Sequence, residues 1–446
     1  MTATENENAD SQTDPGNGSD PDAKRKDRMS FANDVMWSLG FDGLTVVANI
    51  LAVFLLIPIL GDEGYGAYLG LFGIIGPLGG LAWAGVGLAA LQRIVRDNQD
   101  PAAVTRAMLG QGIALATAGS ILATIVAMLT VRTLSLLEIG SVVFAELMAL
   151  TIVMISSFVL QGVKGVPAAS RLRIAVVVIR IAVVFTLWAT GQLTIAALGI
   201  STSVLFSLLT VYVLTRSLPA AGLPVIPGRF SKDDRSMALS FSVPLVGSNL
   251  QLDGDKTVLN AYGMNDIAGV YGAAFRVINM AFTPIRALQS AMHNRLLPHD
   301  ADDHGLHVRR AKSFAMLNLV TIIPIGIVVF FGVELLEPLL GSDFAESRRM
   351  ARWLLIFMPI KALSSVPLGG LLGLGRTTTR AWVMGIAAAV SLGLYIALIP
   401  FLSWVGAVIG TVIGELVLLM LGTERLLTWQ RRSDDEAQLA EANSAI

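Results

Sequence analysis

The chain has 446 residues, of which 54% are hydrophobic and only 15% charged. Its mean hydropathy of +0.67 is too high for a soluble globular domain and predicts a protein embedded in lipid. The 32 Lys and Arg residues are balanced by 33 Asp and Glu residues, so the sequence has no basic footprint for nucleic acid. The chain contains no cysteine, which excludes disulfides, thiolate nucleophiles and cysteine-bound zinc or iron–sulfur centres.

The first 30 residues are polar and have no apolar core of the signal-peptide type. An acidic stretch rich in Asn, Asp, Ser and Gly is followed by a basic run at Lys24, Arg25, Lys26 and Arg28. Such a segment cannot bury enough apolar surface to fold. We therefore expect residues 1–30 to be a disordered cytoplasmic tail, with residues 428–446 as a second cytoplasmic tail.

Between these tails, apolar runs long enough to cross roughly 30 Å of hydrocarbon alternate with short polar breaks. The pattern predicts twelve transmembrane helices and no soluble domain. The expected spans are residues 37–60, 65–91, 108–131, 141–160, 172–190, 193–215, 238–262, 269–296, 314–335, 353–374, 381–400 and 404–427.

Basic residues outside these spans are distributed unevenly between the two sides of the membrane. The two tails and the even-to-odd loops hold 23 Lys and Arg residues, whereas the other loops hold four, Arg132, Arg348, Arg349 and Arg352. Cytoplasmic loops of membrane proteins carry the excess of Lys and Arg. The sequence therefore predicts a multi-pass protein of the cell inner (cytoplasmic) membrane with both termini in the cytoplasm.

An internal repeat emerges when the chain is overlaid on itself with an offset of 206 residues. Tyr65-Gly66-Ala67 then meets Tyr271-Gly272-Ala273, and each triplet opens the second helix of its half. We expect six-helix bundles at 31–216 and 236–427, joined by a cytoplasmic linker at 217–235. An even number of spans per half makes the repeat parallel and leaves a cleft between the bundles.

The first span of each half carries a polar stripe. Ser38, Asp42, Thr45 and Asn49 follow helical spacing on one, and the other carries two rows, Asn249, Asp253, Lys256 and Asn260 beside Ser248, Gln251 and Asp255. A charge near the bilayer centre costs about 2.5–3.5 kcal/mol on insertion scales, so these groups should face protein or a wet cavity. Two interpretations stay open: the stripes line a hydrated cavity between the halves, or Asp253 and Lys256 neutralise each other on one helix.

Five basic residues lie well inside the expected spans: Arg180, Lys256, Arg276, Arg286 and Lys361. Arg173, Arg295 and Arg425 lie at the very ends of spans and are counted with the loops and tails above. Partly desolvated arginine and lysine side chains bind phosphate strongly, so a diphosphate is the kind of headgroup such a cavity would hold. We predict that Lys256, Arg276, Arg286 and Lys361 bind substrate, whereas Arg180 could instead snorkel to lipid headgroups. The residues predicted to line the cavity or couple an ion are Asp42, Asn49, Asn249, Asp253, Asp255 and Asn260.

Small residues at four-residue spacing, such as Gly76 and Gly80, allow helices to approach closely. Four histidines gather in the loop after the expected eighth span, but their spacing matches no known metal-ligand pattern. Asp253-Gly254-Asp255 has the D-x-D form of metal-dependent glycosyltransferases, yet it lies inside a membrane helix. We therefore predict no metal, no cofactor and no enzymatic activity. The histidines are His293, His299, His304 and His307.

Several blocks resemble the polysaccharide (Wzx-type) flippases of the multidrug/oligosaccharidyl-lipid/polysaccharide (MOP) exporter superfamily, over residues 30–430. These blocks are 64–68 (GYGAY), 87–93 (GLAALQR), Asp255-Lys256 and 269–276 (GVYGAAFR). Lys256 and Arg276 match positions where basic residues recur in that family, whereas Arg286 and Lys361 are inferred from depth alone.

The resemblance implies an all-α, MATE/MOP-like fold with two six-helix bundles and a cationic central cavity. It also implies alternating access that moves a polyprenyl-diphosphate-linked oligosaccharide to the outer leaflet for cell-surface polysaccharide biosynthesis. A polysaccharide polymerase and glycosyltransferases are then expected partners. Two alternatives remain, a cation-coupled multidrug antiporter of the same fold and a membrane glycosyltransferase that uses Asp253 and Asp255.

Overall fold

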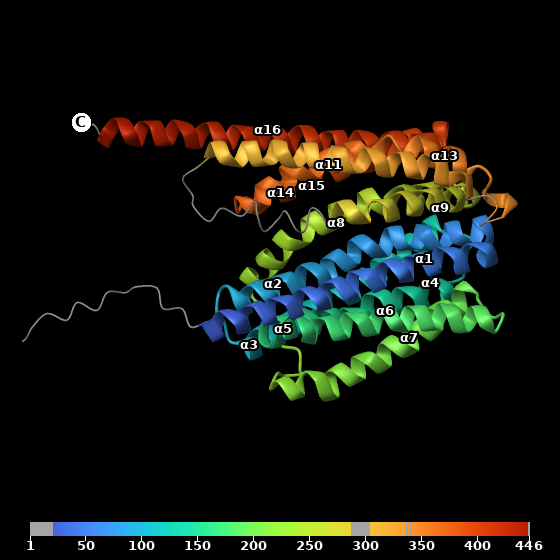
Figure 1. Cartoon of the computed structure of the whole chain (residues 1–446). Helices are drawn as coiled ribbons and strands as arrows, with labels where there is room; N and C mark the ends of the chain where they lie inside the picture. Colours follow the sequence, from blue (N-terminus) through green and yellow to red (C-terminus); the bar gives the residue numbers. More distant parts are fainter. Residues whose placement is uncertain (1–20, 287–303, 336–337, 339–340, 445–446) are drawn as a thin grey trace, which may run out of the picture.

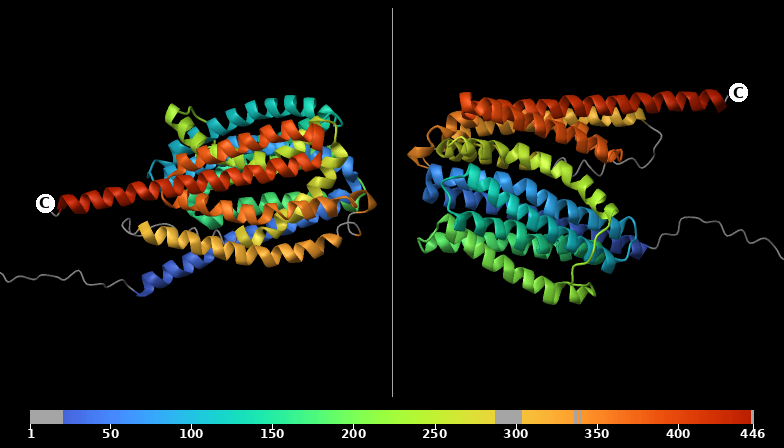
Figure 2. Two further views of the ribbon diagram at one scale, coloured as in Figure 1. Left: turned by 90° about the horizontal axis from the view of Figure 1, so that it is seen from above. Right: turned by 180° about the vertical axis from the view of Figure 1, so that it is seen from behind.

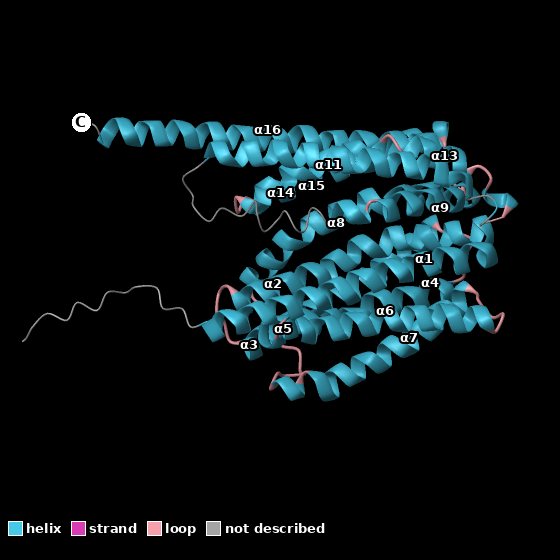
Figure 3. Cartoon of the chain, in the orientation of Figure 1, coloured by secondary structure: helices cyan, strands magenta, loops and turns pink. Residues whose placement is uncertain are grey.

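The computed structural model describes residues 21–286, 304–335, 338 and 341–444. These residues form helices joined by short loops, with no strand among them (Figure 3). The helices lie in two groups, which we call the first half (α1 to η4) and the second half (α8 to α16) (Figure 1). The fold is thus that of an all-α polytopic membrane protein.

The first half ends at η4 and is followed by a non-helical connection at residues 222–231. Its helices are α1 (Pro21–Gly79), η1 (Gly80–Ala84), α2 (Gly85–Val95), α3 (Pro101–Thr130), α4 (Leu136–Val143), η2 (Phe144–Ala149), α5 (Leu150–Lys164), α6 (Val166–Ala189), α7 (Ile195–Tyr212), η3 (Val213–Ser217) and η4 (Pro219–Ala221).

The second half begins with a capped helix, because the Ser231 hydroxyl accepts a hydrogen bond from the Asp234 backbone amide. Its described helices are α8 (Lys232–Ala261), α9 (Asn265–Ala281), α11 (His304–Gly332), η5 (Val333–Leu335), η6 (Ser342–Phe344), α13 (Ser347–Leu354), α14 (Phe357–Gly373), α15 (Thr377–Leu402) and α16 (Trp404–Ser444).

Helix α1 turns back on itself at Gly61. The backbone there has φ 67° and ψ −177°, a conformation that glycine reaches without the steric penalty of a side chain. Residues 21–60 and 62–95 consequently run in opposite directions, side by side (Figure 1). The single 59-residue helix α1 therefore contributes two legs to the bundle.

Eight of the described helical segments are long and apolar enough to span a membrane, or nine if the bent pair Ser342–Leu354 and Phe357–Leu372 forms one span. This count does not confirm the expected twelve. One reason is that Gly43–Val95 counts once although it folds back at Gly61. Another is that α8 carries charged residues in its first turn and in its last third, and α9 has only 17 residues. The expected eighth span, 269–296, also runs beyond the described residues.

The beginning of α1 and the end of α16 lie at the same end of the bundle, which we call the terminal end (Figures 1 and 2). The ends of α2 and α5, with Arg93 and Lys164 in their last turns, also lie there, whereas the connection from α3 to α4 and the short helix α13 lie at the opposite end. This arrangement matches the charge asymmetry of the sequence. Which end faces the cytoplasm stays a prediction.

The two halves meet along a seam between residues 62–85 and helices α8 and α9. Three polar side chains of α8 donate hydrogen bonds to backbone carbonyl oxygens on the other side. Asn249 Nδ2 bonds Gly76 O at 2.8 Å, Thr257 Oγ1 bonds Gly70 O at 2.8 Å, and Asn260 Nδ2 bonds Gly66 O at 2.9 Å. The absence of side chains on these glycines lets the helices approach closely enough for such bonds to form.

The two copies of the Tyr-Gly-Ala motif pack near one another at this seam. A Cβ atom on Gly66 would lie 1.8 Å from Asn265 O, and one on Gly272 would lie 2.1 Å from Leu69 Cδ1. Tyr65 and Tyr271 are both buried. The repeat that is visible in the sequence therefore marks the contact between the halves.

Candidate solute-binding cavity

A cavity of about 290 Å³ lies where the first half meets α8 and α9. The first half provides most of its wall, from both legs of α1, the α4–η2 junction, α6 and α7. The second half adds one residue from each of α8 and α9. The lining residues are Ala48, Asn49, Ala52, Val53, Leu56, Tyr65, Tyr68, Leu69, Phe72, Val142, Ala145, Glu146, Arg180, Val184, Leu198, Gly199, Thr202, Asp253 and Arg276.

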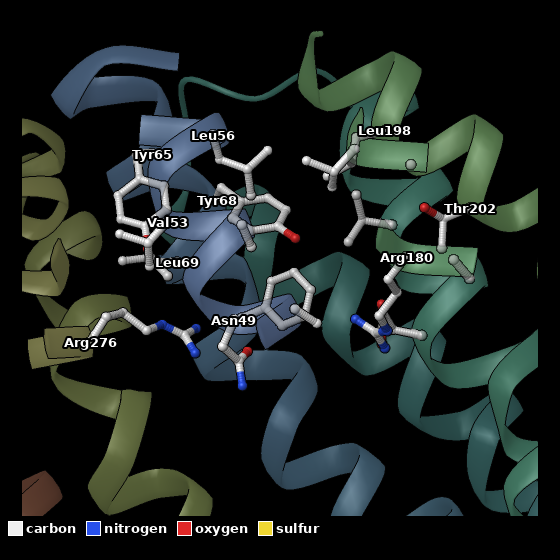
Figure 4. Close-up of a pocket in the computed structure, with 18 of the residues that line it drawn as sticks. Asn49, Val53, Leu56, Tyr65, Tyr68, Leu69, Arg180, Leu198, Thr202 and Arg276 are labelled. Atoms are coloured by element: carbon white, nitrogen blue, oxygen red, sulfur yellow. The ribbon is translucent and has the colours of Figure 1, made fainter. Parts of the chain in front are cut away.

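Two arginines enter this cavity from opposite halves. Figure 4 shows Arg276 of α9 and Arg180 of α6 pointing inward from opposite sides, with Asn49 and Tyr68 between them. Arg276 shares a hydrogen bond with the Tyr65 hydroxyl. Within the described part of the chain, no carboxylate lies within 4 Å of the Arg276 guanidinium. Arg276 therefore presents positive charge to the cavity, where the Asp253 carboxylate of α8 compensates it at longer range than an ion pair.

Arg180 is neutralised by Glu146. Its Nη2 lies 2.6 Å from Glu146 Oε2, and its guanidinium lies 5.4 Å from the centre of the Phe206 ring. Glu146 is located on the π-helical turn η2, and such turns are frequent at functional sites. The structure thus places Arg180 in the cavity wall rather than among lipid headgroups. Our sequence interpretation omitted Glu146, although a carboxylate inside an apolar span is a recognisable signal.

Lys256 lies in the core of the second half and does not line the cavity. Its Nζ is 3.0 Å from Asp255 Oδ1 and 3.4 Å from Asp253 Oδ1, and it lies 3.7 Å from the centre of the Phe275 ring. The side chains of Lys256 and Asp255 are 1% and 0% exposed. Two carboxylates therefore neutralise the lysine, and Asp253 is the one that also reaches the cavity.

The other two predicted substrate cations lie apart from the cavity lining. Lys361 Nζ lies 2.7 Å from Glu415 Oε1, and Ser364 donates a 2.6 Å hydrogen bond to the second Glu415 oxygen. Arg286 is exposed and donates a hydrogen bond to the Asn279 carbonyl oxygen at 2.8 Å. Of the four cations predicted from sequence, only Arg276 is thus among the described residues that line this cavity.

The predicted polar lining residues divide in a similar way. Asn49 and Asp253 line the cavity. Asn249 and Asn260 bond the backbone of α1 at the seam, and Asp255 pairs with Lys256 in the core. The Asp42 side chain lies outside the described part of the structure.

The histidine loop and the D-x-D motif offer no evident catalytic centre. His293 and His299 lie outside the described residues, as do the side chains of His304 and His307. Among the residues whose placement is described, no three His, Cys, Asp or Glu side chains gather in a way that could hold a metal ion. Asp255 is fully buried against Lys256, so the D-x-D pair is not open to a nucleotide sugar.

The sequence matches no known family model and no curated protein. Solved structures nevertheless share its fold. An inward-facing multidrug resistance MATE family transporter of the MOP superfamily aligns with a TM-score of 0.65 and 15% identity, covering 86% of this chain and 96% of the other. An outward-facing structure of a MATE family transporter aligns with a TM-score of 0.61 and 14% identity, covering 89% of this chain and 96% of the other.

A MOP superfamily transporter from Pyrococcus furiosus, described as having a binding pocket of reverse polarity that suggests a different function, gives a TM-score of 0.59 at 13% identity. That alignment covers 88% of this chain and 95% of the other. These similarities show that the chain shares the fold of these transporters. At such low identity they establish the fold and not the substrate.

Proposed function

We propose that this protein is an alternating-access transporter that moves a polyprenyl-diphosphate-linked oligosaccharide from the cytoplasmic to the outer leaflet, for cell-surface polysaccharide biosynthesis. The observation that carries the proposal is Arg276, whose guanidinium enters the cavity between the halves and has no carboxylate of the described residues within 4 Å. Arg180 supplies a second guanidinium on the facing wall.

The chemistry of a guanidinium favours an anionic headgroup. A buried cation is costly unless a counter-charge compensates it, and arginine bonds phosphate oxygens through two parallel N–H donors. In a cavity lined mainly by apolar side chains such as Val53, Leu56 and Phe72, these bonds are less weakened by water. A diphosphate has enough oxygens to engage both arginines.

The size of the cavity indicates which part of the substrate it would hold. At about 290 Å³ it lies at the lower limit of small-molecule pockets, which measure about 300–1,000 Å³. It therefore suits a headgroup, while the lipid tail stays in the membrane and the glycan requires the halves to separate.

A second, larger cleft of about 770 Å³ opens between the halves near the terminal end. Its walls come from α2 and from the ends of α8, α14 and α15, and Arg93 and Arg96 lie in it. Arg93 forms an ion pair with Asp234 across the two halves. Asp233 also lines this cleft, so its arginines are balanced by carboxylates. The cleft supports access for a substrate from the terminal end, which we propose to be cytoplasmic, with the two bundles at 31–216 and 236–427 rocking against each other.

A cation-coupled multidrug antiporter is the second candidate. The same cavity contains the carboxylates of Glu146 and Asp253 and the rings of Tyr65, Tyr68 and Phe72, which would suit an organic cation. The two candidates differ in the sign of the charge that the cavity must bind.

Reconstitution into proteoliposomes tests the proposal. We expect the wild-type protein to accelerate transbilayer movement of a fluorescent polyprenyl-diphosphate oligosaccharide, and Arg276→Gln to abolish the acceleration because the free guanidinium is lost. Arg286→Gln is the matched control, since this exposed arginine lies outside the cavity lining. Failure of the wild-type protein to move the lipid, together with uptake of the organic cation rhodamine 6G, would establish the antiporter instead.

A further inference from the structure

The ion pair between Arg180 and Glu146 connects two helices within one wall of the cavity. Arg180 comes from α6 and Glu146 from η2, and both line the cavity beside Tyr68 of α1. The Glu146 side chain is 9% exposed, whereas the Arg180 side chain is 35% exposed. An anion in the cavity could therefore approach the guanidinium, but one of its donors already binds a carboxylate.

Glu146 is held less firmly than the comparable buried carboxylate of the second half. Glu415 accepts hydrogen bonds at both oxygens, from Lys361 and from Ser364. For Glu146 the ion pair and the hydrogen bond both involve the same oxygen, Oε2, and the same partner, Arg180. Displacing Glu146 from its partner thus breaks one contact, whereas displacing Glu415 would break two.

The other charged residues in the described lining of the cavity are Asp253 and Arg276. Asp253 on α8 already contacts Lys256 at 3.4 Å, and Arg276 on α9 interacts with Tyr65. Within the described lining, Glu146 is therefore the carboxylate that neutralises a cavity arginine by direct contact. It occupies Nη2 of Arg180, one of the donors that a substrate phosphate would use.

We propose that Glu146 is a built-in counter-anion that competes with the diphosphate of the substrate for Arg180 and so sets the affinity of the cavity. This inference rests on the proposed anionic substrate. Without Glu146, Arg180 would bind the diphosphate more strongly and release it more slowly. Because Glu146 returns to Arg180 as the headgroup departs, it compensates the arginine in the empty cavity and favours release.

Binding of farnesyl diphosphate to the purified full-length protein in detergent, measured by calorimetry, tests this inference. We expect Glu146→Gln to tighten binding on the order of tenfold, because a charge-assisted contact no longer competes with the diphosphate for Arg180. Glu415→Gln is the matched control, since it removes a buried carboxylate outside the cavity, and it should leave the affinity unchanged. Adding Arg180→Gln to Glu146→Gln should cancel the gain.

The outcomes separate this inference from the proposed function. Unchanged or weaker binding by Glu146→Gln, with binding lost in Arg276→Gln, would overturn the counter-anion while the anionic substrate stands. An equal gain in Glu415→Gln would also overturn it, since the effect would then be general. Absence of saturable binding in the wild-type protein and in Glu146→Gln alike would overturn the anionic substrate itself. If Glu146→Gln fails to fold, Glu146→Asp keeps the charge with a shorter reach and should tighten binding by a smaller factor.

Discussion

Replacing Gly66 with alanine places one methyl group in the tightest part of the seam. The new Cβ would lie 1.8 Å from Asn265 O and 2.7 Å from Gly269 N, both backbone atoms that cannot rotate away. Overpacking of this kind typically costs 1–3 kcal/mol, and the rigid partners place Gly66 at the upper end, about 3 kcal/mol. The hydrogen bond from Asn260 to Gly66 O would lengthen too, at a further cost of about 0.6 kcal/mol.

The assay is equilibrium unfolding in mixed micelles, with increasing mole fraction of sodium dodecyl sulfate and tryptophan fluorescence as the signal. We expect the free energy of unfolding to fall by about 3–4 kcal/mol in Gly66→Ala. Gly140→Ala is the matched control, because its Cβ would meet nothing within 4 Å and alanine favours the helix. A loss of less than about 1 kcal/mol in Gly66→Ala, or an equal loss in Gly140→Ala, would refute the close approach of the two halves at this point.

Three further predictions follow from the same geometry. Lys256→Met should lower the free energy of unfolding by about 3–5 kcal/mol in the same assay, because it leaves buried Asp255 unpaired, and adding Asp255→Leu should recover most of the loss. Cysteines at Gly70 and Asn260 should form a disulfide on mild oxidation, since a Cβ on Gly70 would lie 3.2 Å from Asn260 Cβ. To detect this disulfide, the chain is cleaved at an engineered protease site in residues 222–231 and run on a non-reducing gel. The two halves should stay joined, and separate fragments would contradict the seam. Glu334→Gln should change the free energy of unfolding by less than about 1 kcal/mol, because its ion pairs with two arginines of α13 are exposed, and a larger loss would contradict this weak role.

The contacts of Lys256 change how a loss of transport in a Lys256 variant should be interpreted. From the sequence, a basic residue inside a membrane span indicates a substrate contact. In the structure its ammonium group lies between two carboxylates and an aromatic ring, away from the cavity lining. Loss of transport in a Lys256 variant is therefore expected to accompany loss of stable protein. An Arg276 variant, by contrast, should lose transport while the protein stays stable, because Arg276 lines the cavity.

The sequence by itself determined the membrane class, the all-helical architecture and the pairing of the two halves. These properties depend on apolar length, loop charge and short repeats, which are local and periodic. The same is true of the break at Gly61, which lies between the expected spans 37–60 and 65–91. The Tyr-Gly-Ala repeat marked the contact between the halves even though the expected count of twelve spans is not confirmed.

Only the tertiary structure decided what each polar group in the membrane faces. Helical spacing showed that Asn249, Asp253 and Asn260 share one face of α8, but it could not show that glycines of α1 lie opposite two of them. It likewise could not pair Arg180 with Glu146, which is 34 residues away in the chain. The reason is physical. A buried charge or amide acquires its role from the group that compensates it. For Asn249, Asn260 and Arg180 that group comes from another helix, whereas Lys256 finds its carboxylates on its own helix.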